Sequence, residues 1–77
     1  MIKINNCYTE YFKIFSNSYN YNVKPGVWLT FDRHTLEYIG VNVFYTVANF
    51  NSLNKECEDK LNELIAKGLL EVIDWKV

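Results

Sequence analysis

The side chains best suited to chemistry in this chain are one histidine, two cysteines and a pair of carboxylates close to the histidine. His34 could act as a general base near neutral pH, and Cys7 or Cys57 could then supply a thiolate nucleophile. Cys57, however, falls in a helical apolar pattern, where a buried neutral thiol is common. Asp32 and Glu37 flank His34 in a way that also suits an ordinary turn, which aspartate often opens. We therefore expect neither a cysteine–histidine site nor a paired-carboxylate site.

Metal and phosphate chemistry lack their usual sequence motifs. The chain contains no CxxC or HxxH pair and no acidic loop of the EF-hand type. Its glycines, Gly26, Gly40 and Gly68, are isolated, so no glycine-rich loop could cradle a phosphate. A turn, a strand kink and a helix stop explain them better. We expect no metal, no cofactor and no enzymatic activity.

The charged residues argue against strongly electrostatic partners. Eight basic side chains oppose nine acidic ones, which gives a formal net charge of −1. A duplex-binding protein would carry clustered basic residues, and an acidic mimic of nucleic acid would carry a carboxylate excess. Arg33 is the single arginine, so bidentate recognition of a phosphate or a base would depend on one side chain. Nucleic acid is therefore a disfavoured partner.

Length and composition predict one cytoplasmic domain. A chain of 77 residues forms a single domain, 1–77, with a modest core. Two cysteines do not make the disulfide framework of small secreted proteins. The first residues lack the apolar stretch of a signal peptide, and no segment has the length of a membrane span, so no membrane partner is expected. Heavy use of Asn, Lys, Ile, Tyr and Phe indicates a low-GC genome, such as that of a bacterium or a phage.

The clearest element is a helix over residues 52–67. Its apolar residues recur at helical spacing and form one stripe: Leu53, Cys57, Leu61, Leu64 and Ile65. Ser52 or Asn51 is the expected N-cap, and Gly68 is expected to end the helix in a Schellman motif. The opposite side carries lysine–carboxylate pairs four residues apart, typical of a solvated face. They are Lys55 with Asp59, Glu56 with Lys60 and Glu63 with Lys67.

Two strands are expected on either side of the turn 32–36. On the second strand, alternate apolar residues form one face: Ile39, Val41, Val43, Tyr45 and Val47. The other face should be polar, but Tyr38 and Phe44 lie on it, and Trp28 joins them from the preceding strand. Three large rings on a face expected to meet water indicate that something covers or binds it.

The two ends of the chain are less regular. Ile2–Ile4 is a candidate strand, and 10–16 fits either a helix or a strand. The strand is favoured there because the β-propensity is high. A final strand over 69–77 has two possible registers, and a slip of one residue decides which face carries Trp75.

The segment 17–22 has no clear apolar period and is interpreted as a loop before the Pro25–Gly26 turn. Its tyrosines and asparagines resemble the composition of recognition loops. Tyr19 and Tyr21 could therefore contact a partner. Alternatively, both rings could fold back over the rim of the core.

These elements predict an α+β fold, in which an antiparallel sheet of about four to five strands carries one helix on one face. The helix covers the face with Val41 and leaves the face with the rings open. Three explanations for the open face are possible from the sequence. They are a homodimer formed sheet to sheet, a binding surface for another macromolecule, and coverage by the chain's own N-terminal segment.

The favoured interpretation is a small non-enzymatic protein-binding module. Aromatic and arginine side chains carry much of the energy of protein interfaces. The candidate partner-binding residues are Trp28, Tyr38, Phe44, Tyr19, Tyr21 and Arg33. Short chains from phages and mobile elements often act as stoichiometric inhibitors, so an anti-defence or immunity-like inhibitor is expected, by association alone. The alternatives are a homo-oligomeric structural or assembly protein and a single-stranded nucleic-acid-binding module.

Overall fold

The computed structural model describes residues 1–44 and 50–73 and shows an α+β fold. Its elements in chain order are β1 (Ile2–Ile4), the 3₁₀ helix η1 (Asn6–Tyr11), β2 (Lys13–Phe15), β3 (Ser18–Lys24), β4 (Val27–Asp32), β5 (Tyr38–Val43), α1 (Phe50–Ala66) and β6 (Leu70–Val72). An antiparallel sheet has the strand order β2-β3-β4-β5, and β1 pairs with β6 in a second sheet. An isolated bridge pairs Lys3 of β1 with Glu37, the residue before β5. The predicted fold class is confirmed.

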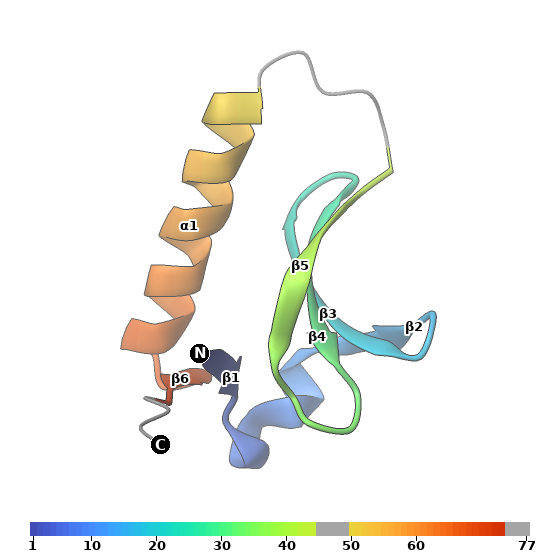
Figure 1. Ribbon diagram of the computed structural model, residues 1–77, viewed down its shortest axis with the longest axis vertical. Coiled ribbons are helices and arrows are strands. Elements are labelled where there is room, and N and C mark those ends of the chain that lie inside the picture. The colour runs from blue at the N-terminus through green and yellow to red at the C-terminus, as the bar shows by residue number, and fades with distance from the viewer. Residues whose placement is uncertain (45–49, 74–77) are drawn as a thin grey trace.

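Helix α1 packs along one face of the four-stranded sheet, and the β2–β3 hairpin projects away from it (Figure 1). The two-stranded sheet lies at the C-terminal end of α1, where it brings the N-terminal strand beside the last strand (Figure 1). One face of the larger sheet is therefore covered by the helix. We call the opposite face the outer face.

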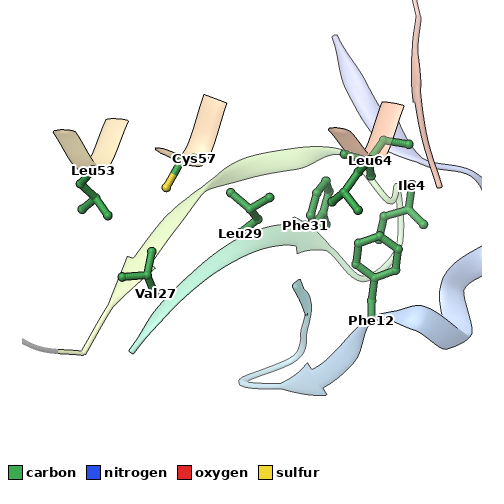
Figure 2. Packing of buried hydrophobic residues seen from close by; sticks show 9 residues of the cluster. Ile4, Phe12, Val27, Leu29, Phe31, Leu53, Cys57 and Leu64 are labelled. Carbon is green, nitrogen blue, oxygen red and sulfur yellow. The ribbon is translucent and has the colours of Figure 1, made fainter. Parts of the chain in front are cut away.

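The core lies between α1 and the inner face of the sheet. Figure 2 shows Leu53 and Cys57 of α1 pointing toward Val27 and Leu29 of β4. The buried cluster consists of Ile4, Phe12, Val27, Leu29, Phe31, Leu53, Cys57, Leu64 and Leu70. Leu61 and Ile65 pack against it from the same helix, so the predicted apolar stripe is confirmed.

The end of α1 has the predicted Schellman geometry. The Gly68 amide donates to the Ile65 carbonyl at 3.1 Å, and the Leu69 amide donates to the Leu64 carbonyl at 3.0 Å. Gly68 has a φ of 84°, which only glycine adopts at little cost. At its other end the helix begins at Phe50, so Asn51 and Ser52 lie inside it and the predicted N-cap was wrong.

Replacing Gly68 by alanine should lower the free energy of unfolding by about 1 kcal/mol. No atom lies within 4 Å of the added Cβ, so the loss comes from the left-handed backbone and not from a clash. For a domain of this size the melting temperature should fall by about 4–8 °C, which thermal unfolding followed by circular dichroism would detect. Lys67→Ala is the matched control. A similar loss in both variants would contradict the assignment.

Segment 10–16 contains both a helical part and a strand, the two structures that the sequence allowed. The 3₁₀ helix η1 runs to Tyr11, and strand β2 begins at Lys13. The rings of Tyr8 and Tyr11 lie 5.9 Å apart on η1, as their helical spacing suggests. Phe12 follows η1 and is buried against Phe31. The strand prediction was therefore right for the second half of the segment and wrong for the first.

The interpretation of 17–22 as a loop was wrong, because this segment forms most of β3. Tyr19 and Tyr21 face α1 and pack against the core, while Asn20 and Asn22 lie on the outer face. A tight turn joins β2 to β3. Both of its central residues, Ser16 and Asn17, have positive φ values of 53° and 60°, as a type I′ hairpin requires.

A β-bulge changes which side chains of β5 face the core. Thr30 pairs with Gly40 and Phe31 pairs with Tyr38, so Ile39 is the extra residue between the two pairs. Gly40 permits this local backbone with a φ of 153°. The bulge turns Tyr38 toward the core, 5.4 Å from the Phe31 ring, and leaves Ile39 61% exposed. The predicted facing of these two residues was wrong. The predicted contributions of Tyr45 and Val47 fall outside the described residues, as does Trp75.

Candidate binding surface on the outer face

The outer face receives its side chains from the alternation along β4. Because Val27, Leu29 and Phe31 point into the core, Trp28 and Thr30 point the other way. Their cross-strand partners extend the same face on both sides. Trp28 lies between Asn22 and Asn42, and Thr30 lies between Asn20 and Gly40.

Three rings from three strand regions meet on this face and form what we call the ring cluster: Phe15, Trp28 and Phe44. The Phe15 and Trp28 rings meet edge to face with centroids 5.1 Å apart and an interplanar angle of 86°. The Phe15 and Phe44 centroids are 6.2 Å apart. Phe44 is 64% exposed, and it follows directly after β5. The cluster therefore presents apolar surface to solvent beside Trp28.

An amide network fixes the sheet beneath the ring cluster. Asn42 Nδ2 donates to Thr30 Oγ1 at 2.8 Å, and Thr30 Oγ1 donates to Asn20 Oδ1 at 3.0 Å. Asn20 Nδ2 lies within 3.0–3.4 Å of the carbonyl oxygens of Lys13, Phe15 and Ser18. Asn20 is 1% exposed and its bond with Thr30 is buried, so this network couples β3, β4 and β5 to β2.

The chain's own N-terminal hairpin covers part of the outer face. Phe15 of β2 packs on Trp28, and the ammonium group of Lys13 lies 5.9 Å from the Trp28 ring centroid. The sequence favoured a strand here, but a strand of three residues did not show that both side chains would reach the outer face. Alternation of Lys13 and Phe15 with Ile14 was the available signal.

The six predicted site residues do not come together. Trp28 and Phe44 lie on the outer face, but Tyr38 is turned inward by the bulge. Tyr19 and Tyr21, as described above, lie against the core. Arg33 is exposed in the β4–β5 turn, at the end of that hairpin opposite Phe44.

The candidate catalytic residues are placed apart from this surface. The Asp32 carboxylate accepts hydrogen bonds from the backbone amides of His34 at 2.7 Å and Thr35 at 2.8 Å. These two bonds, the Thr35 bond foremost, lower the pKa of Asp32. The carboxylate thus closes the turn, as a turn-opening aspartate is expected to do. Within the described residues, no three Cys, His, Asp or Glu side chains are arranged to hold a metal ion.

The two cysteines should differ sharply in reactivity. Burial raises the pKa of the Cys57 thiol, and the Glu56 carboxylate raises it further, whereas Cys7 is exposed on η1. Fewer thiolates form at Cys57, and the structure around it must open before a reagent can reach the sulfur. With an opening cost of about 3 kcal/mol, we expect 5,5′-dithiobis(2-nitrobenzoate) to modify Cys57 at least about 100-fold more slowly than Cys7. Cys7→Ser should abolish the fast phase and Cys57→Ser the slow one. Equal rates would contradict the register of α1.

Two grooves are lined in part by residues of β3. The charged groove has a volume of about 370 Å³ and is lined by Val23, Lys24, Glu56, Asp59, Lys60 and Glu63. The polar–aromatic groove has a volume of about 310 Å³ and is lined by Tyr11, Lys13, Asn20, Tyr21, Asn22 and Trp28. The second adjoins the ring cluster, because Trp28 belongs to both.

The charges of the charged groove compensate one another. Lys24 of β3 lies 2.7 Å from Glu56, and Lys60 lies 2.8 Å from Glu63. The predicted pairing of Glu56 with Lys60 was therefore wrong, because β3 supplies a nearer cation and a spacing of three residues also suits a helix. The predicted pairs of Lys55 with Asp59 and of Lys67 with Glu63 are present at 4.0 Å and 3.5 Å.

Comparison of the chain with protein-family models, with curated proteins and with solved structures gave no match. Among the described helices, none combines the length and the apolar character needed to cross a bilayer. The function must therefore be argued from the surface itself.

Proposed function

We propose that the chain is a small non-enzymatic binding module that engages another protein through its outer face. The observation that carries this proposal is the ring cluster, where Phe44 is 64% exposed beside Phe15 and Trp28. Ile39, near the opposite end of edge strand β5, is also 61% exposed. Exposed clusters of rings typically mark interaction sites, and aromatic anchors dominate interface energies.

The rigidity of the surface supports the same role. The amide network holds the strands beneath the rings, and the edge-to-face contact orients Trp28. Rings fixed before binding lose little conformational entropy when a partner arrives. Within this proposal the module acts stoichiometrically in the cytoplasm of a low-GC bacterium or of a phage host. It covers a functional surface of its partner, as an anti-defence or immunity-like inhibitor would.

The test compares two exposed apolar residues of the sheet. Phe44→Ser removes the outermost ring of the cluster, whereas Ile14→Ser changes a side chain on β2 that is 51% exposed and outside the cluster. Affinity capture from a low-GC bacterial lysate, followed by titration of the purified partner, should show about 30-fold weaker binding for Phe44→Ser, which corresponds to about 2 kcal/mol. Ile14→Ser should bind like the unmodified chain. An equal loss of affinity in the two variants, or no loss in either, would contradict the proposal.

Light-scattering chromatography over a wide concentration range separates this proposal from self-association. A dimer that Phe44→Ser dissociates would assign the ring cluster to a homo-oligomeric structural protein. A monomer at all concentrations leaves the cluster free for a foreign partner.

A further inference from the structure

The polar–aromatic groove brings together aromatic rings, an amide and an ammonium group. Tyr11 and Trp28 supply aromatic rings, Asn22 supplies an amide, and Lys13 supplies an ammonium group. Tyr21 and Asn20 also line the groove, but the Tyr21 ring packs against Phe12 and the Asn20 amide is used in the network described above. Its volume of about 310 Å³ is at the lower end of the range for small-molecule sites, so a small ligand would fill it.

The charge of this groove is not neutralised by the protein. Of the residues that line it, none carries a carboxylate, and within the described part of the chain no carboxylate oxygen lies within 4.0 Å of Lys13 Nζ. In the charged groove, by contrast, Lys24 and Lys60 are both paired with glutamates. An anionic group would therefore find its counter-charge in the polar–aromatic groove.

The cation and the largest ring face lie next to each other. Lys13 Nζ is 5.9 Å from the centroid of the Trp28 ring. Because Lys13 is exposed, its side chain can change rotamer and uncover the ring. A planar ligand stacked on an aromatic face of the groove could then place an attached anion against the ammonium group. Bases bind aromatic side chains in this way in proteins that hold single-stranded nucleic acids.

Asn22 offers a specific hydrogen-bond acceptor at the same place. Its Nδ2 group donates to the carbonyls of Lys24 at 2.8 Å and Val27 at 3.1 Å, which uses both amide hydrogens and fixes the side chain. Among the described residues, no donor bonds its Oδ1. An N–H on the edge of a stacked base could donate to this oxygen.

From these contacts we infer that the polar–aromatic groove is a binding site for a single nucleotide, with the base stacked on the rings and the phosphate on Lys13. This inference does not rest on the proposed protein partner. Lys13, which has no carboxylate partner among the described residues, would serve one phosphate. This agrees with the net charge of −1 and with the lack of a basic stripe for a long polymer in the sequence.

Titration of ¹⁵N-labelled protein with UMP, AMP, uridine and inorganic phosphate tests the inference. We expect at least one of the two nucleotides to shift the indole signal of Trp28 and the side-chain amide signals of Asn20 and Asn22 in a saturable way. Uridine should bind more weakly than UMP, and phosphate alone should leave the indole signal unchanged.

Two variants separate the roles of charge and stacking. Lys13→Gln should reduce the affinity for UMP to that for uridine, while Lys55→Gln, on an exposed site of α1, is the matched change of charge. Tyr11→Ser should weaken both UMP and uridine by roughly 5-fold or more, as loss of a stacking ring does. Ile14→Ser, which lies outside both the groove and the ring cluster, should leave nucleotide binding unchanged.

A four-nucleotide uridine strand distinguishes the two sources of the ligand. Binding tighter than that of UMP would indicate a nucleotide within a single strand, with log K falling against log salt concentration by about 0.7 for each phosphate contact. Equal binding would indicate a free nucleotide. The inference is overturned if neither UMP nor AMP gives saturable shifts at millimolar concentration, or if Lys55→Gln weakens binding as much as Lys13→Gln.

Discussion

Replacing Asn20 by aspartate should lower the free energy of unfolding by about 3 kcal/mol, nearly as much as replacing it by alanine. Asn20 is 1% exposed, and its Nδ2 group has two hydrogens to share among three carbonyl oxygens at 3.0–3.4 Å. An aspartate has the same shape and could still accept from Thr30. It cannot donate, so it would lose the bonds to these part-buried carbonyls and set a carboxylate oxygen against them.

The pH dependence of the free energy of unfolding of the Asn20→Asp variant provides a second, independent test. Burial beside carbonyl oxygens raises the folded-state pKa of the new carboxyl above its unfolded value of about 3.9. The destabilisation is therefore fully present above the folded-state pKa. It is partly relieved as the pH falls below that value, because the protonated carboxyl regains one donor.

Urea unfolding followed by circular dichroism, at pH 7 and near pH 4.5, measures both effects. Asn62→Asp, at an exposed site of α1, is the matched control and should change stability by about 0.5 kcal/mol or less. Should Asn20→Asp prove as stable as the unmodified chain at pH 7, the network would not hold the hairpin as described.

The same asparagine shows why β3 was missed in the sequence. Asparagine is rare in strands because its side chain bonds to nearby backbone in turns. In β3 the Asn20 amide does bond to backbone, but to the carbonyls of the adjacent β2–β3 hairpin. The period-2 alternation of Tyr19, Tyr21 and Val23 was present all along and outweighed the low propensity.

Other features differed in how far the sequence could reveal them. Helix α1 was predictable because its apolar stripe extends over many residues. Its end was predictable because Gly68 directly follows the last apolar turn. The bulge at Ile39 was not, since it depends on how two strands pair, and Gly40 was only a hint of it. Of the surface, Trp28 and Phe44 followed from alternation. Phe15 could not be assigned without knowing that β2 begins after a 3₁₀ helix.

The two faces of the sheet can be told apart by the same substitution made on each. Phe31 is fully buried, with Phe12 and Tyr38 rings each 5.4 Å away, so Phe31→Ala should cost about 3–5 kcal/mol. A domain of this length has about 4–12 kcal/mol of stability in total, so this loss would remove from about a quarter to all of it. Phe15→Ala should cost only about 1–2 kcal/mol, because it loses two ring contacts at a surface that water already reaches.

Urea unfolding of the two alanine variants decides whether the outer face is a surface or a second core. If Phe31→Ala does not fold, Phe31→Leu keeps the comparison measurable, since a leucine retains most of the buried volume and should cost about 1–1.5 kcal/mol. A loss for Phe15→Ala as large as that for Phe31→Ala would mean that the ring cluster exists to hold the sheet together. A clearly smaller loss would mean that the fold does not depend on the Phe15 ring, which leaves this part of the ring cluster available for binding.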